Sequence, residues 1–165
     1  MTLPSRSHAQ LRLLNRIEAG VRSIQHMLDC GTCGHRQVAL ALEGIGLYCT
    51  LEVALPVPTG GGAKRCDIVV VDALGTVAIE VDGWAPREST REKLRLLPPE
   101  VLRVLILRHR KSRPAVPLAD RIICMRASLD PLLFLNRGAF GISLRSRSVP
   151  RTTRIPHTLL ELKKG

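Results

Sequence analysis

The sequence predicts a mixed α/β domain, and three stretches carry this prediction. Residues 13–28 have helical spacing, residues 66–84 form a hairpin pattern, and residues 101–108 form an apolar run with β-branched residues. A helical segment lies between the hairpin and the last run. That run is therefore expected to be a strand parallel to the hairpin's second strand and buried on both faces.

A chain of 165 residues has room for one domain with a modest core and extensions. We expect residues 1–34 to form an amphipathic helix and a turn, residues 35–135 to form the α/β domain, and residues 136–165 to form a basic tail. No stretch reaches the roughly 18 uncharged apolar residues that a membrane-spanning helix needs, so we expect no membrane span.

The first predicted element is an amphipathic helix with an arginine-bearing opposite face. Its apolar stripe consists of Leu13, Ile17, Val21, Ile24 and Leu28. Arginine-rich, nearly acid-free N-termini are also typical of mitochondrial presequences. The regular stripe favours a helix that packs on the core over a targeting signal.

A Cys-x-x-C motif follows this helix at Cys30 and Cys33, with His35 two residues further on. The motif is half of a zinc site, and a structural zinc ion needs four ligands. We therefore prefer a helix-to-helix turn, with Cys30 and Cys33 kept as a weak zinc candidate. Five irregularly spaced cysteines make a poor disulfide framework, which favours a reducing compartment.

The next predicted elements are a short helix over residues 35–46 and an alternating strand over residues 47–54. In the helix, Val38, Leu42 and Ile45 share the apolar face. In the strand, Leu47, Cys49, Leu51 and Val53 lie on one face and Glu52 lies on the other. Prolines and three successive glycines then lead into the hairpin.

The hairpin carries three acids at one end: Asp67, Glu80 and Asp82. Side chains two apart on a strand point the same way, so Glu80 and Asp82 share a face, and Asp67 on the partner strand can lie close to them. Clustered carboxylates must be solvated, paired with cations or bound to a metal. The ordinary alternative is ion pairing with arginines such as Arg87 or Arg65.

Beyond the hairpin, Ser89 or Thr90 is expected to cap a helix that carries Leu94 and Leu97. The buried strand follows. A short strand near residues 119–126 and a final helix near residues 128–135 are expected to close the fold.

The chain is strongly basic, with 25 lysines and arginines against 14 acids and a formal charge of +11. This balance suggests a polyanionic partner such as RNA. Aromatic residues are scarce, which favours phosphate contacts over base stacking; Trp84 is expected to stack on a base or, more readily, to pack over the hairpin end. The expected phosphate contacts are Arg108, Arg110, Lys111, Arg113, Arg137, Arg145, Arg147, Arg151 and Arg154.

The order of predicted elements, with Asp67 on one hairpin strand and Glu80 on the next, resembles the restriction-endonuclease-like core of the PD-(D/E)XK family, an α-β-β-β-α-β series. The resemblance implies that these two acids hold Mg²⁺ or Mn²⁺, which activates a water for attack on phosphate. The family's lysine is expected two residues after the second acid, where this chain has Asp82.

A narrower resemblance is to the RAP domain, an RNA-binding module related to very-short-patch-repair endonucleases. It rests on VAIEVDGW and on Thr90, Lys93 and Leu97 in a Thr-x-x-Lys-x-x-x-Leu segment, and it covers roughly residues 38–110. Family members usually have a histidine soon after the glycine, whereas this chain has Trp84-Ala85-Pro86-Arg87. The resemblance implies RNA binding in an organelle, including ribosomal components.

Three functions follow as hypotheses. The first is a non-catalytic RNA-binding protein that needs no cofactor and binds rRNA and neighbouring proteins in a ribosome of the mitochondrial matrix. The second is a metal-dependent nuclease that uses Asp67, Glu80 and Asp82, helped by Glu43 or Glu52. The third is a protein-interaction scaffold whose charge keeps it soluble.

Overall fold

The computed structural model describes residues 4–25, 32–57, 62–109 and 112–125. They belong to one compact unit, Met1–Ser128, and a second unit comprises Leu129–Gly165. The expectations for Cys30, for the final helix and for the basic tail therefore lie outside the described residues. In the described part, no helix is both long and apolar enough to cross a membrane.

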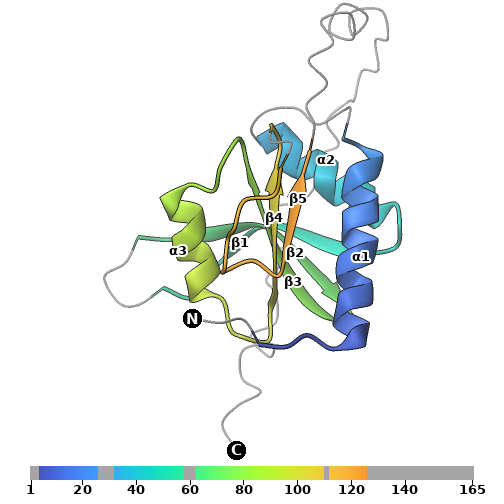
Figure 1. Ribbon diagram of the computed structural model, residues 1–165, viewed down its shortest axis with the longest axis horizontal. Coiled ribbons are helices and arrows are strands. Elements are labelled where there is room, and N and C mark those ends of the chain that lie inside the picture. Colours follow the sequence, from blue (N-terminus) through green and yellow to red (C-terminus); the bar gives the residue numbers. More distant parts are fainter. Residues whose placement is uncertain (1–3, 26–31, 58–61, 110–111, 126–165) are drawn as a thin grey trace, which may run out of the picture. The chain divides into compact units, whose positions relative to one another are not determined.

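The described elements form a mixed α/β fold, as the sequence predicts (Figure 1). A five-stranded sheet has the order β1-β2-β3-β4-β5; β2 is antiparallel to both β1 and β3, whereas β3, β4 and β5 run parallel to one another. In chain order the elements are α1 (His8–Ser23), α2 (Thr32–Glu43), β1 (Tyr48–Ala54), β2 (Arg65–Asp72), β3 (Gly75–Asp82), α3 (Glu88–Leu96), β4 (Leu102–Leu107) and β5 (Arg121–Cys124).

Helix α1 begins with a capping box. The Ser7 hydroxyl accepts a hydrogen bond from the Gln10 backbone N–H, and the Gln10 side chain accepts one from the Ser7 N–H. The predicted stripe is buried where the helix is described, with Leu13, Ile17 and Val21 inaccessible to solvent. The prediction of a core-packing helix is confirmed.

Apolar side chains pack on both faces of the sheet. One cluster joins α1 and α2 to the face that carries Ile79 and Val104, and a smaller one joins Leu94 and Leu97 of the α3 region to Ala78. Figure 1 shows α1 and α3 on opposite sides of the sheet. The acids of β3 alternate with its core residues, so Glu80 lies on the α3 side.

The hairpin and the crossover strand are confirmed. Asp72 accepts a hydrogen bond from the Leu74 N–H in the turn, and Gly75 takes a φ of 141°, which favours glycine. Strand β4 is buried along its whole length and pairs in parallel with β3. Its one charge, Arg103, is buried and donates to the Leu94 and Leu97 carbonyls, so α3 ends on a buried guanidinium.

Several local predictions were wrong. Helix α3 starts one residue before Ser89 and has Arg87 as its N-cap with no side-chain cap bond, so neither Ser89 nor Thr90 caps it. The expected strand over residues 47–54 is present as the edge strand β1, in which Leu51 is exposed. Ile45 lies beyond the end of α2 and is also exposed.

Candidate functional site

Three carboxylates lie at matching positions on three neighbouring strands. Ile68 pairs with Ile79, so the residues one step further, Asp67 and Glu80, stand opposite each other across β2 and β3. Leu51 pairs with Ile68 and Val53 with Cys66, so Glu52 stands opposite Asp67 across β1 and β2. We call Glu52, Asp67 and Glu80 the acid row.

A lysine from α3 joins two members of this row. The Lys93 Nζ atom donates to Asp67 Oδ1 at 3.0 Å and to Glu80 Oε2 at 2.6 Å. Backbone donors reach the other two oxygens: the Val81 N–H reaches Asp67 Oδ2 at 2.9 Å, and the Asp67 N–H reaches Glu80 Oε1 at 3.4 Å. All four oxygens of the pair thus accept a hydrogen bond.

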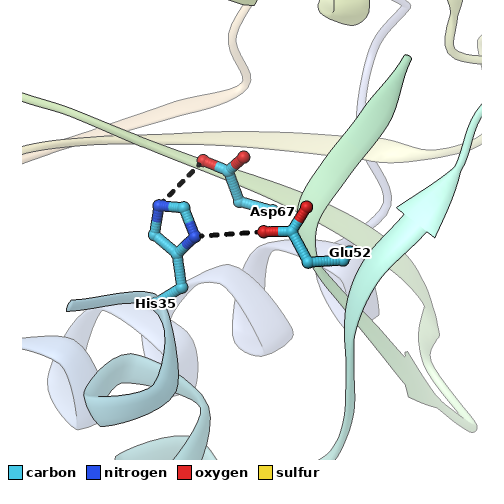
Figure 2. Close-up of side chains that lie close together, drawn as sticks. All are labelled: His35, Glu52 and Asp67. Atoms are coloured by element: carbon cyan, nitrogen blue, oxygen red, sulfur yellow. Dashed lines mark ion pairs between the residues drawn. The ribbon is translucent and has the colours of Figure 1, made fainter. Parts of the chain in front are cut away.

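A histidine from α2 lies between Glu52 and Asp67 (Figure 2). His35 Nε2 lies 3.4 Å from Asp67 Oδ2, and its Nδ1 lies 3.4 Å from Glu52 Oε1. The Nδ1 atom is buried and has no hydrogen-bond partner within the described structure. Glu52 takes a φ of 54°, which is rare for a residue with a side chain.

Burial and mutual repulsion decide the charge of this cluster. Burial, followed by the negative charge of Asp67, raises the pKa of Glu80 to about 7, with Lys93 acting in the opposite direction. For Lys93, burial lowers the pKa, but the hydrogen bonds and attraction of Glu80 and Asp67 outweigh it, so the pKa is raised. Burial, followed by the charge of Glu80, also raises the pKa of the Cys66 thiol.

The third predicted acid has a different partner. Asp82 is buried and is held by Arg87, whose Nε donates at 2.6 Å and whose backbone N–H donates at 3.1 Å. This is the ordinary ion-pair alternative expected for the hairpin acids. Of the two acids expected to help, Glu52 joins the row, whereas Glu43 lies at the C-terminal end of α2.

The predicted phosphate contacts are only partly described. Arg108 is half-buried after β4, and its backbone N–H donates to the Asp82 carbonyl. Arg113 donates to Glu18 of α1 at 2.8 Å. Arg110, Lys111 and the arginines from Arg137 onward lie outside the described residues, as do Cys30 and the Cys33 side chain of the weak zinc candidate.

Trp84, which was expected to stack on a base or to pack over the hairpin end, is 70% exposed. Its ring centroid lies 5.7 Å from that of His109, with the planes tilted by 40°.

Sequence reasoning did not assign Lys93 or His35 to the site, although both positions carry a signal. Lys93 lies three residues after the fully buried Thr90 and four before Leu97, so it shares the inward face of its helix. His35 lies three residues before the buried Val38 on α2. A polar residue at an inward position needs a partner, and each of these finds one in the acid row.

The cluster combines three carboxylates, an ammonium and an imidazole on five elements. Paired carboxylate oxygens are ligands that Mg²⁺ and Mn²⁺ prefer, and imidazole suits zinc and other transition metals. Comparison with family models, with curated proteins and with solved structures gives no match for this chain.

Proposed function

We propose that this chain hydrolyses phosphodiester bonds in nucleic acid with a divalent metal ion, and that RNA is its substrate class. One observation supports the proposal: a lysine ammonium lies within 3.0 Å of two buried carboxylates, Asp67 and Glu80, on neighbouring strands. Its partners are the two acids that match the nuclease pattern. In this proposal Lys93 of α3 takes the role of the lysine that the nuclease pattern has at the position of Asp82.

The elements from α2 to β4 support a restriction-endonuclease-like core. Their order is helix, three strands, helix, strand, the series that the resemblance implies. Glu80 lies well along β3, toward the end at which open sheets tend to carry their sites. We assign this fold to the chain as part of the proposal, together with its likeness to the RAP domain.

Each side chain has a distinct role in the proposed reaction. Asp67 and Glu80 would hold Mg²⁺ or Mn²⁺, and burial together with the charge of Asp67 raises the pKa of Glu80, as is common for carboxylates at functional sites. When bound, such an ion would supply Lewis-acid chemistry at the phosphate and lower the pKa of a bound water. Lys93 stays protonated because its pKa is raised, so it can donate a hydrogen bond to the phosphate oxygen on which negative charge develops.

The test is a cleavage assay on the full chain. Single- and double-stranded RNA and DNA of one sequence are incubated with Mg²⁺ or Mn²⁺, and wild type is compared with Asp67→Asn, Glu80→Gln and Lys93→Met. We expect each variant to cleave at least about 100-fold more slowly, because Asp67 and Glu80 would hold the metal ion and Lys93 would stabilise the charge on the phosphate. Glu92→Gln is the control, since Glu92 is exposed on the same helix and pairs with Lys64.

A second function is favoured by the completeness of the Lys93 network. Because all four oxygens of Asp67 and Glu80 already accept hydrogen bonds, the pair is stable without a metal. The chain would then be a non-catalytic RNA-binding protein, for example one that binds rRNA in a mitochondrial ribosome, with its charge of +11 as the source of affinity.

The assay separates the two functions. If wild type cleaves none of the four substrates with either metal, the hydrolase proposal is wrong. RNA affinity then decides the second function: contact with about six phosphates predicts that log affinity falls with log salt at a slope near −4 for single strands. A slope near zero would leave neither function standing.

A further inference from the structure

We propose that His35, Glu52 and Asp67 form a binding site for a divalent transition-metal ion, Zn²⁺ or Mn²⁺, which stands whether or not the chain hydrolyses nucleic acid. The three side chains come from α2, β1 and β2, and the imidazole lies between the two carboxylates, with a different ring nitrogen facing each (Figure 2). Each offers one ligand atom, and these atoms all lie within 4.8 Å of one another.

The distance between His35 Nε2 and Asp67 Oδ2 fits two ligands of one metal ion better than it fits a direct hydrogen bond. Both ring nitrogens of His35 lie 3.4 Å from a carboxylate oxygen. Two ligands of a tetrahedral ion with bonds of about 2.1 Å are about 3.4 Å apart. His35 Nδ1 is buried yet makes no hydrogen bond in the described structure, so the present arrangement leaves the imidazole incompletely satisfied.

An imidazole binds a metal through one nitrogen and usually presents the other N–H to an acceptor. His35 Nε2 is the nitrogen next to Asp67, so we assign the metal to Nε2 and Asp67. Glu52 is the most exposed of the three, with 44% of its side chain accessible, and its ligand oxygen lies within 4.8 Å of the other two ligand atoms.

Charge also favours a cation at this place. The acid row has three carboxylates, and the Lys93 ammonium contacts only Asp67 and Glu80. Glu52 opposes Asp67 across the strands, where two like charges destabilise the sheet. A divalent ion between them removes this repulsion, which a neutral imidazole cannot do.

The ligand types select the metal. One imidazole with two carboxylates suits Zn²⁺ or Mn²⁺, whereas Mg²⁺ prefers an all-oxygen octahedral shell with several waters. The ordinary alternative is that His35 is protonated and pairs with the two acids without any metal. That alternative predicts no metal binding at this place.

The test measures metal binding to the full chain by isothermal titration calorimetry without nucleic acid, so its result does not depend on the cleavage assay. We expect one Zn²⁺ or Mn²⁺ per chain, and Mg²⁺ at least about tenfold weaker. His35→Ala is expected to lower the affinity for Zn²⁺ or Mn²⁺ at least about tenfold. The control is His109→Ala, which removes a histidine beside Trp84 and should change neither value.

Two further variants keep the outcome decisive. Glu52→Gln lies on an edge strand and is exposed, so it tests the site even if His35→Ala fails to fold; a loss of at least about threefold is expected. Cys30→Ser with Cys33→Ser tests the weak zinc candidate. Zn²⁺ binding that survives in Glu52→Gln but disappears in the cysteine variant, or the absence of both Zn²⁺ and Mn²⁺ binding, would overturn the proposal.

Discussion

Two buried acid networks lie at different levels of the same sheet. At the start of the parallel strands, Asp120 accepts two hydrogen bonds from Arg6, at 2.6 and 2.9 Å, and one from the Arg103 N–H at 2.7 Å. Further along, the acid row crosses β1, β2 and β3, and its member Glu80 pairs with Leu105 of β4.

The two networks differ in charge balance. Asp120 has a bidentate guanidinium partner, so its charge is matched, and the pair ties the segment before α1 to the start of β5. The acid row has more carboxylates than firm cations, and Glu80 has its pKa raised to about 7. An ion pair with balanced charge stabilises the fold. A row of carboxylates without enough positive charge lowers the stability of the folded chain, and residues that do so are concentrated at ligand-binding sites.

The largest expected effect is on the matched pair. Asp120→Ala leaves the Arg6 guanidinium buried without its partner, and breaking a buried pair in this way costs about 3–5 kcal/mol of unfolding free energy. Urea denaturation measures the loss. Arg16→Ala is the control, because its pair with Asp72 is longer and more exposed, and it should cost less than about 1 kcal/mol. Equal losses in the two variants would contradict the assignment of Asp120 to the fold.

An intermediate effect is expected when Glu80 is replaced. Its pKa is raised in the folded state from 4.5 to about 7, so between these pH values the folded chain binds a proton that the unfolded chain does not. This group's contribution to stability is therefore fully present below pH 4.5 and is lost as the pH rises through about 7. In Glu80→Gln this loss should disappear.

The measurement is the free energy of unfolding in urea from pH 4.5 to 8, with a chelator present. Relative to wild type, Glu80→Gln should gain on the order of 1–3 kcal/mol across this range. Glu92→Gln should run parallel to wild type, since its carboxylate is exposed. A Glu80→Gln curve that also runs parallel to wild type would mean that Lys93 matches the charge of the row completely.

The sequence alone predicts most of this fold, because its strongest signals are periodic. The stripe of α1, the Asp72-to-Gly75 turn and the apolar run of β4 each show their structure locally. The pairing of Asp67 with Glu80 also follows from strand register. Only Asp82 departs from the expected trio, because Arg87 at the next helix start captures it.

The rest of the site could not be predicted, because it depends on contacts between distant elements. Lys93 reaches the row only because α3 packs on the face that carries Glu80, and His35 only because α2 starts near β1. No local sequence pattern specifies these contacts between distant elements. The exposure of Leu51 likewise depends on the whole sheet, because it follows from the edge position of β1.

The smallest expected effect concerns the charged cluster around Glu18 on α1. In this cluster positive charges outnumber negative ones, which is the opposite of the acid row. Three guanidinium groups, those of Arg22, Arg113 and Arg121, donate to this one carboxylate at 2.7–2.8 Å. Burial raises the pKa of Glu18, but the hydrogen bonds of Arg22 and Arg121 outweigh it, and the pKa is lowered. Surplus positive charge on a surface suits phosphate, just as surplus negative charge in the row suits a metal.

Arg113→Ala tests whether this surplus contacts RNA. Its side chain is more than half exposed, so the substitution should change the unfolding free energy by less than about 1 kcal/mol. If Arg113 contacts one phosphate, the salt slope of binding to single-stranded RNA should become shallower by about 0.7. Arg91→Ala, an exposed arginine paired with Glu88 on α3, is the matched control. An unchanged slope for Arg113→Ala would make the Glu18 cluster a surface ion-pair network, and RNA affinity would then have to come from other basic residues.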